Sequence, residues 1–114
     1  MADVNVTNPF GVAETIVLSA TGNQAVIIKN DITILDGAST IATGNRTLIA
    51  TLSAQLKIGA KILLKAKTTG TETTIFSTGF VAPTITGVAG KIKTQGFIFD
   101  GTNFLPTGAS LQID

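Results

Sequence analysis

The chain has 114 residues and a formal net charge of +1. Only 13% of its residues are charged, and it contains neither cysteine nor histidine. It therefore offers no disulfide and no thiolate or imidazole metal ligand, and its net charge argues neither for nor against a polyanionic partner. The length fits one domain with its own core. The longest uninterrupted aliphatic run, Ala25–Ile28, is far shorter than the ~20 residues of a membrane-spanning helix, so we expect no membrane association.

The start of the chain has neither the basic nor the apolar stretch of a secretory signal, so we expect synthesis in a cytosol. Residues 1–12 predict an extended arm, because Pro9 cannot donate a hydrogen bond to a strand ladder. Residues 13–114 predict a single β domain, since Thr, Ile and Val are abundant and their branched β-carbons favour strands.

Short β-branched segments alternate with turn residues along this domain. We expect roughly eight to ten short strands, drawn from residues 13–18, 25–29, 32–35, 40–43, 47–52, 60–68, 73–78, 80–86, 91–99, 103–105 and 110–113. Only Ser53–Gly59 allows a helical turn, and it is too short to stand alone. No fixed-period repeat is present. The pattern predicts an all-β fold, a compact antiparallel β-sandwich or barrel.

Gly70–Pro106 is the stretch around which we expect the domain to be organised. It holds all but one of the phenylalanines, in a chain without Trp or Tyr, so these rings are the only large side chains that can lock a core or an interface. The stretch includes Asp100-Gly101 between apolar segments, a strong hairpin signal.

The apolar phase changes within 91–99, where Gly96 stands at the changeover. Either Gly96 is a bulge that re-phases the strand, or the second half of the strand is buried on both faces. Ala25–Ile28 and Leu48-Ile49 are also apolar on both faces. A small sandwich has one interior, so a second burial surface supplied by other chains is one interpretation, and ordinary exposed aliphatic side chains are the other.

The remaining side chains give little support to catalysis. The acids are few and mostly at turns, and Asp31 and Asp36, which flank one predicted strand, are expected to be solvated turn acids rather than a cation site. Ser53 with Lys57 is a chance pairing, and the segment from Gly87 to Lys91 lacks the spacing of a phosphate-binding loop. We therefore expect no enzyme, no catalytic or metal site and no cofactor.

Lys61, Lys65 and Lys67 share one face of the predicted strand 60–68, opposite Ile62 and its apolar neighbours. A nucleic-acid site would need interleaved aromatic rings or more arginine, so we expect no nucleic-acid partner. A solvated strand face that discourages edge pairing is the favoured interpretation, and a docking surface for an acidic partner is the alternative.

Four segments carry a resemblance to a known class of proteins: GTETT at 70–74, STGF at 77–80, APTITGVAGK at 82–91 and FIFDGTNFLPTG at 97–108. They resemble the small β-rich capsid decoration and head-fibre (auxiliary capsid) proteins of tailed bacteriophages, over about the last 40 residues. The resemblance implies a virion protein without an active site, often trimeric, that sits on the capsid surface and reinforces the lattice of the major capsid protein.

On this basis we expect a homotrimer with part of the aromatic set at or beneath a subunit or shell interface. The candidate interface residues are Phe97, Phe99, Phe104, Phe76 and Phe80, and the possible docking charges are Lys61, Lys65 and Lys67. The alternative function is a receptor- or carbohydrate-binding module of a phage tail or adhesin. Sugar platforms usually stack on Trp or Tyr, which this chain lacks.

Overall fold

The computed structural model describes residues 13–114, and this part of the chain is all-β, with ten strands and no helix. In chain order the strands are β1 (Ala13–Val17), β2 (Gly22–Ile28), β3 (Ile32–Ala42), β4 (Arg46–Leu52), β5 (Lys61–Thr68), β6 (Thr73–Phe76), β7 (Ile85–Thr86), β8 (Ile92–Phe99), β9 (Phe104–Pro106) and β10 (Leu111–Gln112). The predicted arm of residues 1–12 lies outside the described residues.

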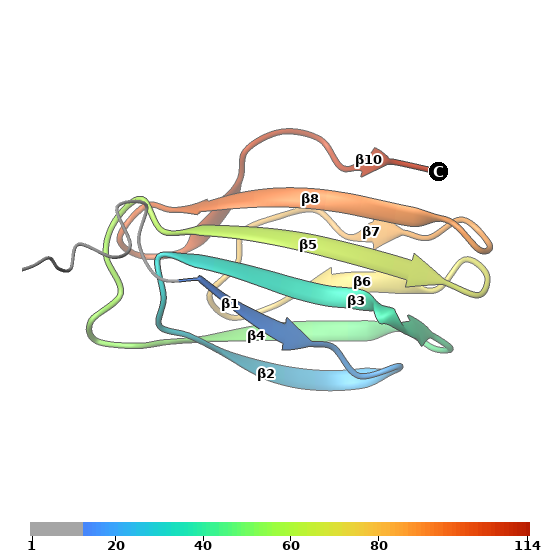
Figure 1. The fold of residues 1–114 in the computed structure, drawn as a ribbon, viewed down its shortest axis with the longest axis horizontal. Coiled ribbons are helices and arrows are strands. Elements are labelled where there is room, and N and C mark those ends of the chain that lie inside the picture. The colour runs from blue at the N-terminus through green and yellow to red at the C-terminus, as the bar shows by residue number, and fades with distance from the viewer. Residues whose placement is uncertain (1–12) are drawn as a thin grey trace, which may run out of the picture.

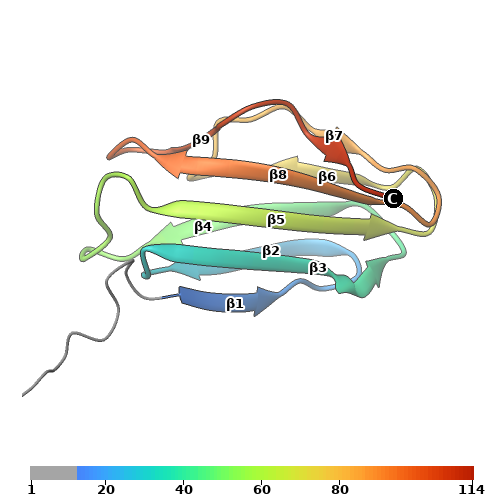
Figure 2. The same ribbon diagram turned by 45° about the horizontal axis from the view of Figure 1, so that its top comes forward.

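The strands form two mixed sheets that lie in two layers (Figure 1). Sheet A has the order β1-β3-β5-β8-β10, with β9 also paired to β8, and sheet B has the order β2-β4-β6-β7. From β1 to β6 the chain alternates between the sheets, so each strand pairs in parallel with the next-but-one strand in sequence (Figure 2). Antiparallel pairs form only where β7 joins β6 and where β8 joins β5, β9 and β10.

The expected all-antiparallel arrangement is therefore wrong, and so is the barrel, because neither sheet closes on itself. The short connections near Thr21 and Asn30 do not fold the chain back onto its own sheet. They carry it across to the facing sheet, where the backbone N–H of Gly22, at the start of β2, donates to the carbonyl oxygen of Asn45, just before β4, at 2.9 Å. Each connection thus joins two layers rather than two neighbouring strands.

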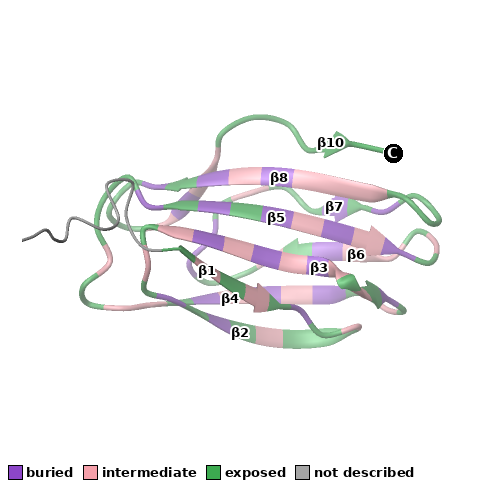
Figure 3. Cartoon of the chain, viewed as in Figure 1, coloured by how far each residue is buried: buried purple, intermediate pink, exposed green. Residues whose placement is uncertain are grey.

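Alternation of buried and exposed side chains fixes which face of each strand points into the core (Figure 3). In β5, Ile62, Leu64 and Ala66 are buried, whereas Lys61 and Leu63 are exposed. The core gathers such buried residues from both sheets into one cluster. The predicted face assignment of β5 is confirmed.

The phenylalanines of 70–106 form one connected group of rings inside the molecule. Phe97 lies 5.1 Å from Phe76 and 5.2 Å from Phe80 between ring centroids, both at steep interplanar angles. Phe104 extends the group, with centroids 6.0 Å from Phe80 and 5.1 Å from Phe99. Edge-on aromatic contacts of this kind add specific geometry to apolar burial, so the rings hold the β8–β9 hairpin against sheet B.

Gly96 is not a bulge. The register of β8 against β5 runs without interruption from Ile98 opposite Lys61 to Ile92 opposite Lys67. Phe97 and Phe99 point inward, and Gly96 and Ile98 point outward, by simple alternation. The register shift occurs instead in β3, between Gly37 and Ala42.

Several predicted boundaries also change. Residues 40–43 belong mostly to the long β3 and do not form a separate strand, and of 80–86 only Ile85–Thr86 is a strand. Pro83 lies outside it, as expected of a residue that cannot donate to a ladder. The hairpin at Asp100 is confirmed, but its loop spans four residues, because Phe99 pairs with Phe104. The Asp100 carboxylate accepts the backbone N–H groups of Thr102 and Asn103, each at 2.8 Å.

Arg46 ties the two sheets together from inside. Its side chain is 1% exposed and points inward from β4. Its Nε donates to the Ser19 carbonyl oxygen at 2.8 Å, and its Nη2 donates to the carbonyl oxygens of Gly37, at 3.1 Å, and of Thr40. Burial lowers the pKa of Arg46, and the nearby Asp36 charge opposes that effect. The irregular part of β3 therefore wraps a buried guanidinium.

Candidate functional site

The outer face of sheet B is the most unusual surface of the described chain. Val26, Ile28, Leu48, Ala50 and Thr74 are buried, so the residues between them point outward. This face, called the sheet B outer face below, consists of Asn23, Ala25, Ile27, Thr47, Ile49, Thr51, Thr73 and Ile75. Not one of these side chains carries a charge.

Three isoleucines make this face apolar. Ile27 retains 59% and Ile75 retains 37% of their side-chain exposure, and Ile49 is half-buried. Single exposed aliphatic residues are common on soluble proteins, but a strand face without any charge is not, because charged side chains normally keep such faces in water. The two-sided apolar character predicted for 25–28 and for 48–49 is thus present as one exposed face.

Sheet A has a different outer face, in which charge and apolar groups alternate in rows across the strands. One row contains Thr15, Ile34, Leu63 and Gly96, and a second contains Val17, Asp36, Lys65 and Thr94. Lys61, Lys65 and Lys67 all point outward here, as predicted. Asp36 stands opposite Lys65 on the neighbouring strand, so part of the lysine charge is offset within the sheet itself.

Asp36 is held by the chain that follows it. Its carboxylate accepts the Ser39 hydroxyl at 2.6 Å and the backbone N–H groups of Ala38 and Ser39 at 3.0 and 3.1 Å. These bonds, the Ser39 hydroxyl foremost, lower the pKa of Asp36 to about 2, and the Lys65 charge adds to the effect. The carboxylate stabilises the irregular turn of β3 and is not free for an external ligand.

Four of the five predicted interface rings lie in the interior. Phe97, Phe99, Phe104 and Phe80 are between 0% and 6% exposed, and Phe76 is half-buried. The chain uses them to fill its own core, since it has no other large side chains for that purpose. These rings can lie beneath an interface, but they do not form its contact surface.

Chemical sites are not apparent in residues 13–114. This part of the chain contains no group of three or more acidic, histidine or cysteine side chains arranged to hold a metal ion. The Ser53 hydroxyl accepts the Gln55 backbone N–H at 3.4 Å, an ordinary turn contact. None of the described elements is a helix of the length and hydropathy that a membrane span requires. The outer faces of the two sheets remain the candidate functional surfaces.

Comparison with known proteins adds no assignment, because no family model, no curated protein and no solved structure matches this chain significantly.

Arg46 is the structural residue that we did not predict. A local signal for it exists, because Arg46 has the same strand parity as Leu48 and Ala50, which places it on the inward face of β4. No acidic side chain in the sequence indicates that this charge is buried, because all three hydrogen-bond acceptors of Arg46 are backbone carbonyl oxygens.

Proposed function

We propose that this protein is a structural component of a bacteriophage virion, which associates with copies of itself, as a homotrimer, and decorates and stabilises the capsid lattice. One observation carries the proposal: the uncharged sheet B outer face leaves Ile27 and Ile75 in water. Burial of such a face against a neighbouring protein is favourable, at roughly 25 cal/mol for each Å² of apolar surface. The resemblance of residues 70–108 to decoration proteins supports the virion as the setting.

The size of the face indicates how it acts. Strands β2 and β4 have seven residues each, so the face is ~23 Å long, and its three main strands make it ~14 Å wide, which gives roughly 300 Å². A standard stable interface buries about 800 Å² on each partner. A single contact through this face is therefore weak, and stable attachment requires several copies that bind together.

Stabilisation of the shell then follows from mass action. A protein that binds the assembled lattice and not its free subunits shifts the equilibrium away from disassembly. Several weak contacts of this kind, between copies or with a repeated lattice, together give stable attachment without any single strong contact. No catalytic group is needed for this role.

The alternative, a receptor- or carbohydrate-binding module, has less support. Stacking of a sugar ring requires an exposed aromatic face. Among residues 13–114 the only phenylalanine that is not buried is Phe76, and its ring packs against Phe80 and Phe97 at 5.3 and 5.1 Å. A reproducible hit on a glycan array would favour this alternative.

The proposal is tested by placing charges on the sheet B outer face. Ile27 retains 59% of its exposure, so a partner can bury about that part of the ~2–3 kcal/mol that full burial of an isoleucine provides. Loss of ~1.5 kcal/mol corresponds to about tenfold weaker association per contact. We expect Ile27→Lys with Ile75→Lys to reduce co-sedimentation with capsid shells that lack the protein and to shift sedimentation velocity toward the monomer.

Ile58→Lys is the matched control, because Ile58 is 76% exposed in the connection before β5 and lies on neither outer face. Equal binding of the double variant and the wild-type protein to the shells would contradict the proposal.

A further inference from the structure

Strand β2 forms an open edge of sheet B, because β4 is its only partner strand in the described chain (Figure 1). It runs from Gly22 to Ile28 without a proline or a charged side chain, and its register with β4 is unbroken, so it contains no bulge. A long, flat and uncharged edge strand is a template for pairing with another strand, which soluble proteins normally prevent. The edge of β2 is therefore a candidate contact surface.

The other edge strands of the described chain carry the usual protection. β1 is shorter than β2, and its Glu14 shares a row with the buried Thr33, so it points inward, where it accepts the side-chain amide of Asn30 at 2.6 Å. Strands β7, β9 and β10 have only two or three residues each. Inward-pointing charges and very short strands both discourage pairing at an edge. Strand β2 has neither form of protection.

The hydrogen bonds of β2 show which of its backbone groups face the open edge. The Gly22 N–H donates to the Asn45 carbonyl oxygen, just before β4, so the even-numbered residues of β2 face β4. Backbone groups alternate in direction along a strand, so the N–H and C=O groups of Asn23, Ala25 and Ile27 point to the open edge. Within the described part of the chain no strand lies beside them on that edge.

We propose that β2 pairs antiparallel with β2 of a second copy of this chain, about a twofold axis at Ala25. Ala25 of one copy then stands opposite Ala25 of the other, and Asn23 of each copy stands opposite Ile27 of the other. Each of these pairs exchanges two backbone hydrogen bonds, and this register uses all the edge-facing residues of both strands. No like charges meet, because β2 has no charged side chain, and the small Ala25 side chains leave room at the axis.

A second copy fits this edge better than an unrelated strand. A twofold pair uses the same edge on both subunits, so it closes on itself and leaves neither β2 edge open. The pairing also continues sheet B across both copies and joins their outer faces into one surface of roughly 600 Å². That area approaches the ~800 Å² per partner of a standard interface. A twofold pair does not itself build the homotrimer proposed above, so the two proposals can fail separately.

Single-cysteine variants test the register, since the chain has no cysteine of its own. In the proposed pair the two Cα atoms at position 25 lie ~5.5 Å apart, within the range that a disulfide bridges. The two Cα atoms at position 23 lie ~14 Å apart, as do those at position 27, which no disulfide can span. In a glutathione redox buffer we expect Ala25→Cys to form covalent dimers about tenfold faster than Asn23→Cys or Ile27→Cys. A mixture of the last two variants should form the mixed dimer.

Ile58→Cys measures the rate of random collision, because Ile58 is 76% exposed in the connection before β5, away from the edge of β2. Equal rates at positions 23, 25 and 27 would indicate a parallel pair and overturn the proposal. Covalent dimers of Ala25→Cys that form no faster than those of Ile58→Cys would overturn it as well.

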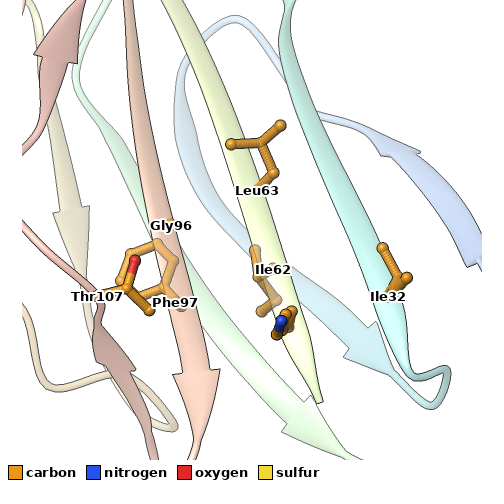
Figure 4. A pocket seen from close by; sticks show the side chains of 7 residues that line it. Ile32, Ile62, Leu63, Gly96, Phe97 and Thr107 are labelled. Atoms are coloured by element: carbon orange, nitrogen blue, oxygen red, sulfur yellow. The ribbon is translucent and has the colours of Figure 1, made fainter. Parts of the chain in front are cut away.

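An apolar pocket on the outer face of sheet A is the competing surface for self-association (Figure 4). Its volume is about 440 Å³, and Ile32, Leu63 and Phe97 are among the residues that line it. Leu63 is 43% exposed and lies on the other layer, so addition of Leu63→Ser should leave the cross-linking rate of Ala25→Cys unchanged. Loss of the cross-link in that double variant, with the fold retained, would assign the contact to sheet A and overturn the proposal.

Amide hydrogen exchange of the wild-type chain supplies a second measurement. An increase in protein concentration from the micromolar to the millimolar range should slow exchange at Ala25 and Ile27 several-fold. Exchange at Thr15 and Val17, whose N–H groups face the open edge of β1, should not change. Full protection of Ala25 and Ile27 in the dilute monomer would mean that the chain covers this edge itself, and the proposal would be overturned.

Discussion

Replacement of Arg46 by methionine tests how the two sheets are held together. The change preserves an unbranched apolar side chain but removes every donor to the Ser19, Gly37 and Thr40 carbonyl oxygens. A buried acceptor left without a partner costs ~1–3 kcal/mol. Only the bond to Gly37 is buried throughout, so we assign it ~2 kcal/mol and assign the two partly buried bonds ~0.5–1 kcal/mol each.

Part of this loss is offset. The Nη1 atom of Arg46 is buried and has no hydrogen-bond partner, and the charge itself is desolvated, so methionine removes two unfavourable terms. We therefore expect Arg46→Met to reduce the free energy of unfolding by about 2–3 kcal/mol. Arg46→Lys should also reduce the free energy of unfolding, because one ammonium group cannot supply the planar fork of the guanidinium. The reduction should be similar or smaller, since the ammonium group can still donate to some of the same carbonyl oxygens.

Urea denaturation followed by circular dichroism measures both variants. Lys57→Met is the control, since Lys57 is exposed, and it should change the unfolding free energy by no more than ~0.5 kcal/mol. If Arg46→Met unfolds at the same urea concentration as the wild-type protein, the buried guanidinium does not link the sheets energetically, and the reasoning is refuted.

Other predictions concern a turn, a close contact and the uncharged face. Asp36→Asn should flatten the pH dependence of stability between about pH 4 and pH 2: the lowered pKa means that ionised Asp36 stabilises the fold above that window, and that this contribution disappears as the pH falls through about 2. Because Asp36 is largely solvated, the loss at neutral pH should stay below ~1 kcal/mol, as measured by thermal unfolding. Gly79→Ala should destabilise by at least ~2 kcal/mol in urea, because Gly79 has a φ of 88° and an added Cβ would lie 2.7 Å from the Ala50 carbonyl oxygen; a stable variant would refute this close contact. Ile27→Lys alone should leave the unfolding free energy within ~0.5 kcal/mol of wild type while it weakens self-association in sedimentation equilibrium. A marked fall in the unfolding free energy together with weaker self-association would mean that Ile27 stabilises the fold instead.

The sequence predicts well what depends on neighbouring residues. The alternation of Lys61, Lys65 and Lys67 with Ile62 and Leu64 is local, and the structure confirms the inward and outward faces of β5. The hairpin after Phe99 is confirmed for the same reason, since Asp100 forms its turn with residues two and three positions later. The all-β class follows from such local preferences added along the chain.

The pairing between distant strands was not predicted from the sequence. Nothing in a short connection such as the one at Thr21 distinguishes a chain that folds back beside its own strand from one that crosses to the facing sheet. The parallel pairs of β1 with β3 and of β2 with β4 depend on contacts 19 and 24 residues apart, as Ala13 with Ile32 and Gly22 with Arg46. Both interpretations of Gly96 failed, because β8 keeps an uninterrupted register with β5 and a simple alternation in which Phe97 and Phe99 are buried and Ile98 is exposed.

The candidate surface was predicted in kind but not in place. The sequence indicated segments that are apolar on both faces, and 25–28 does have an exposed apolar side, formed by Ala25 and Ile27. The aromatic residues drew the predicted interface toward 97–104, because large rings stabilise cores and interfaces alike. Only the three-dimensional arrangement shows that the rings fill the interior and that isoleucine and threonine cover the outside.

An image reconstruction, at side-chain resolution, of the virion in which we propose this protein resides tests the central claim most directly. We predict that Ile27, Ile49 and Ile75 on sheet B face another protein molecule, either a second copy of this chain or the capsid shell. A reconstruction in which sheet B faces open solvent in every copy, or from which the protein is missing altogether, would contradict the account.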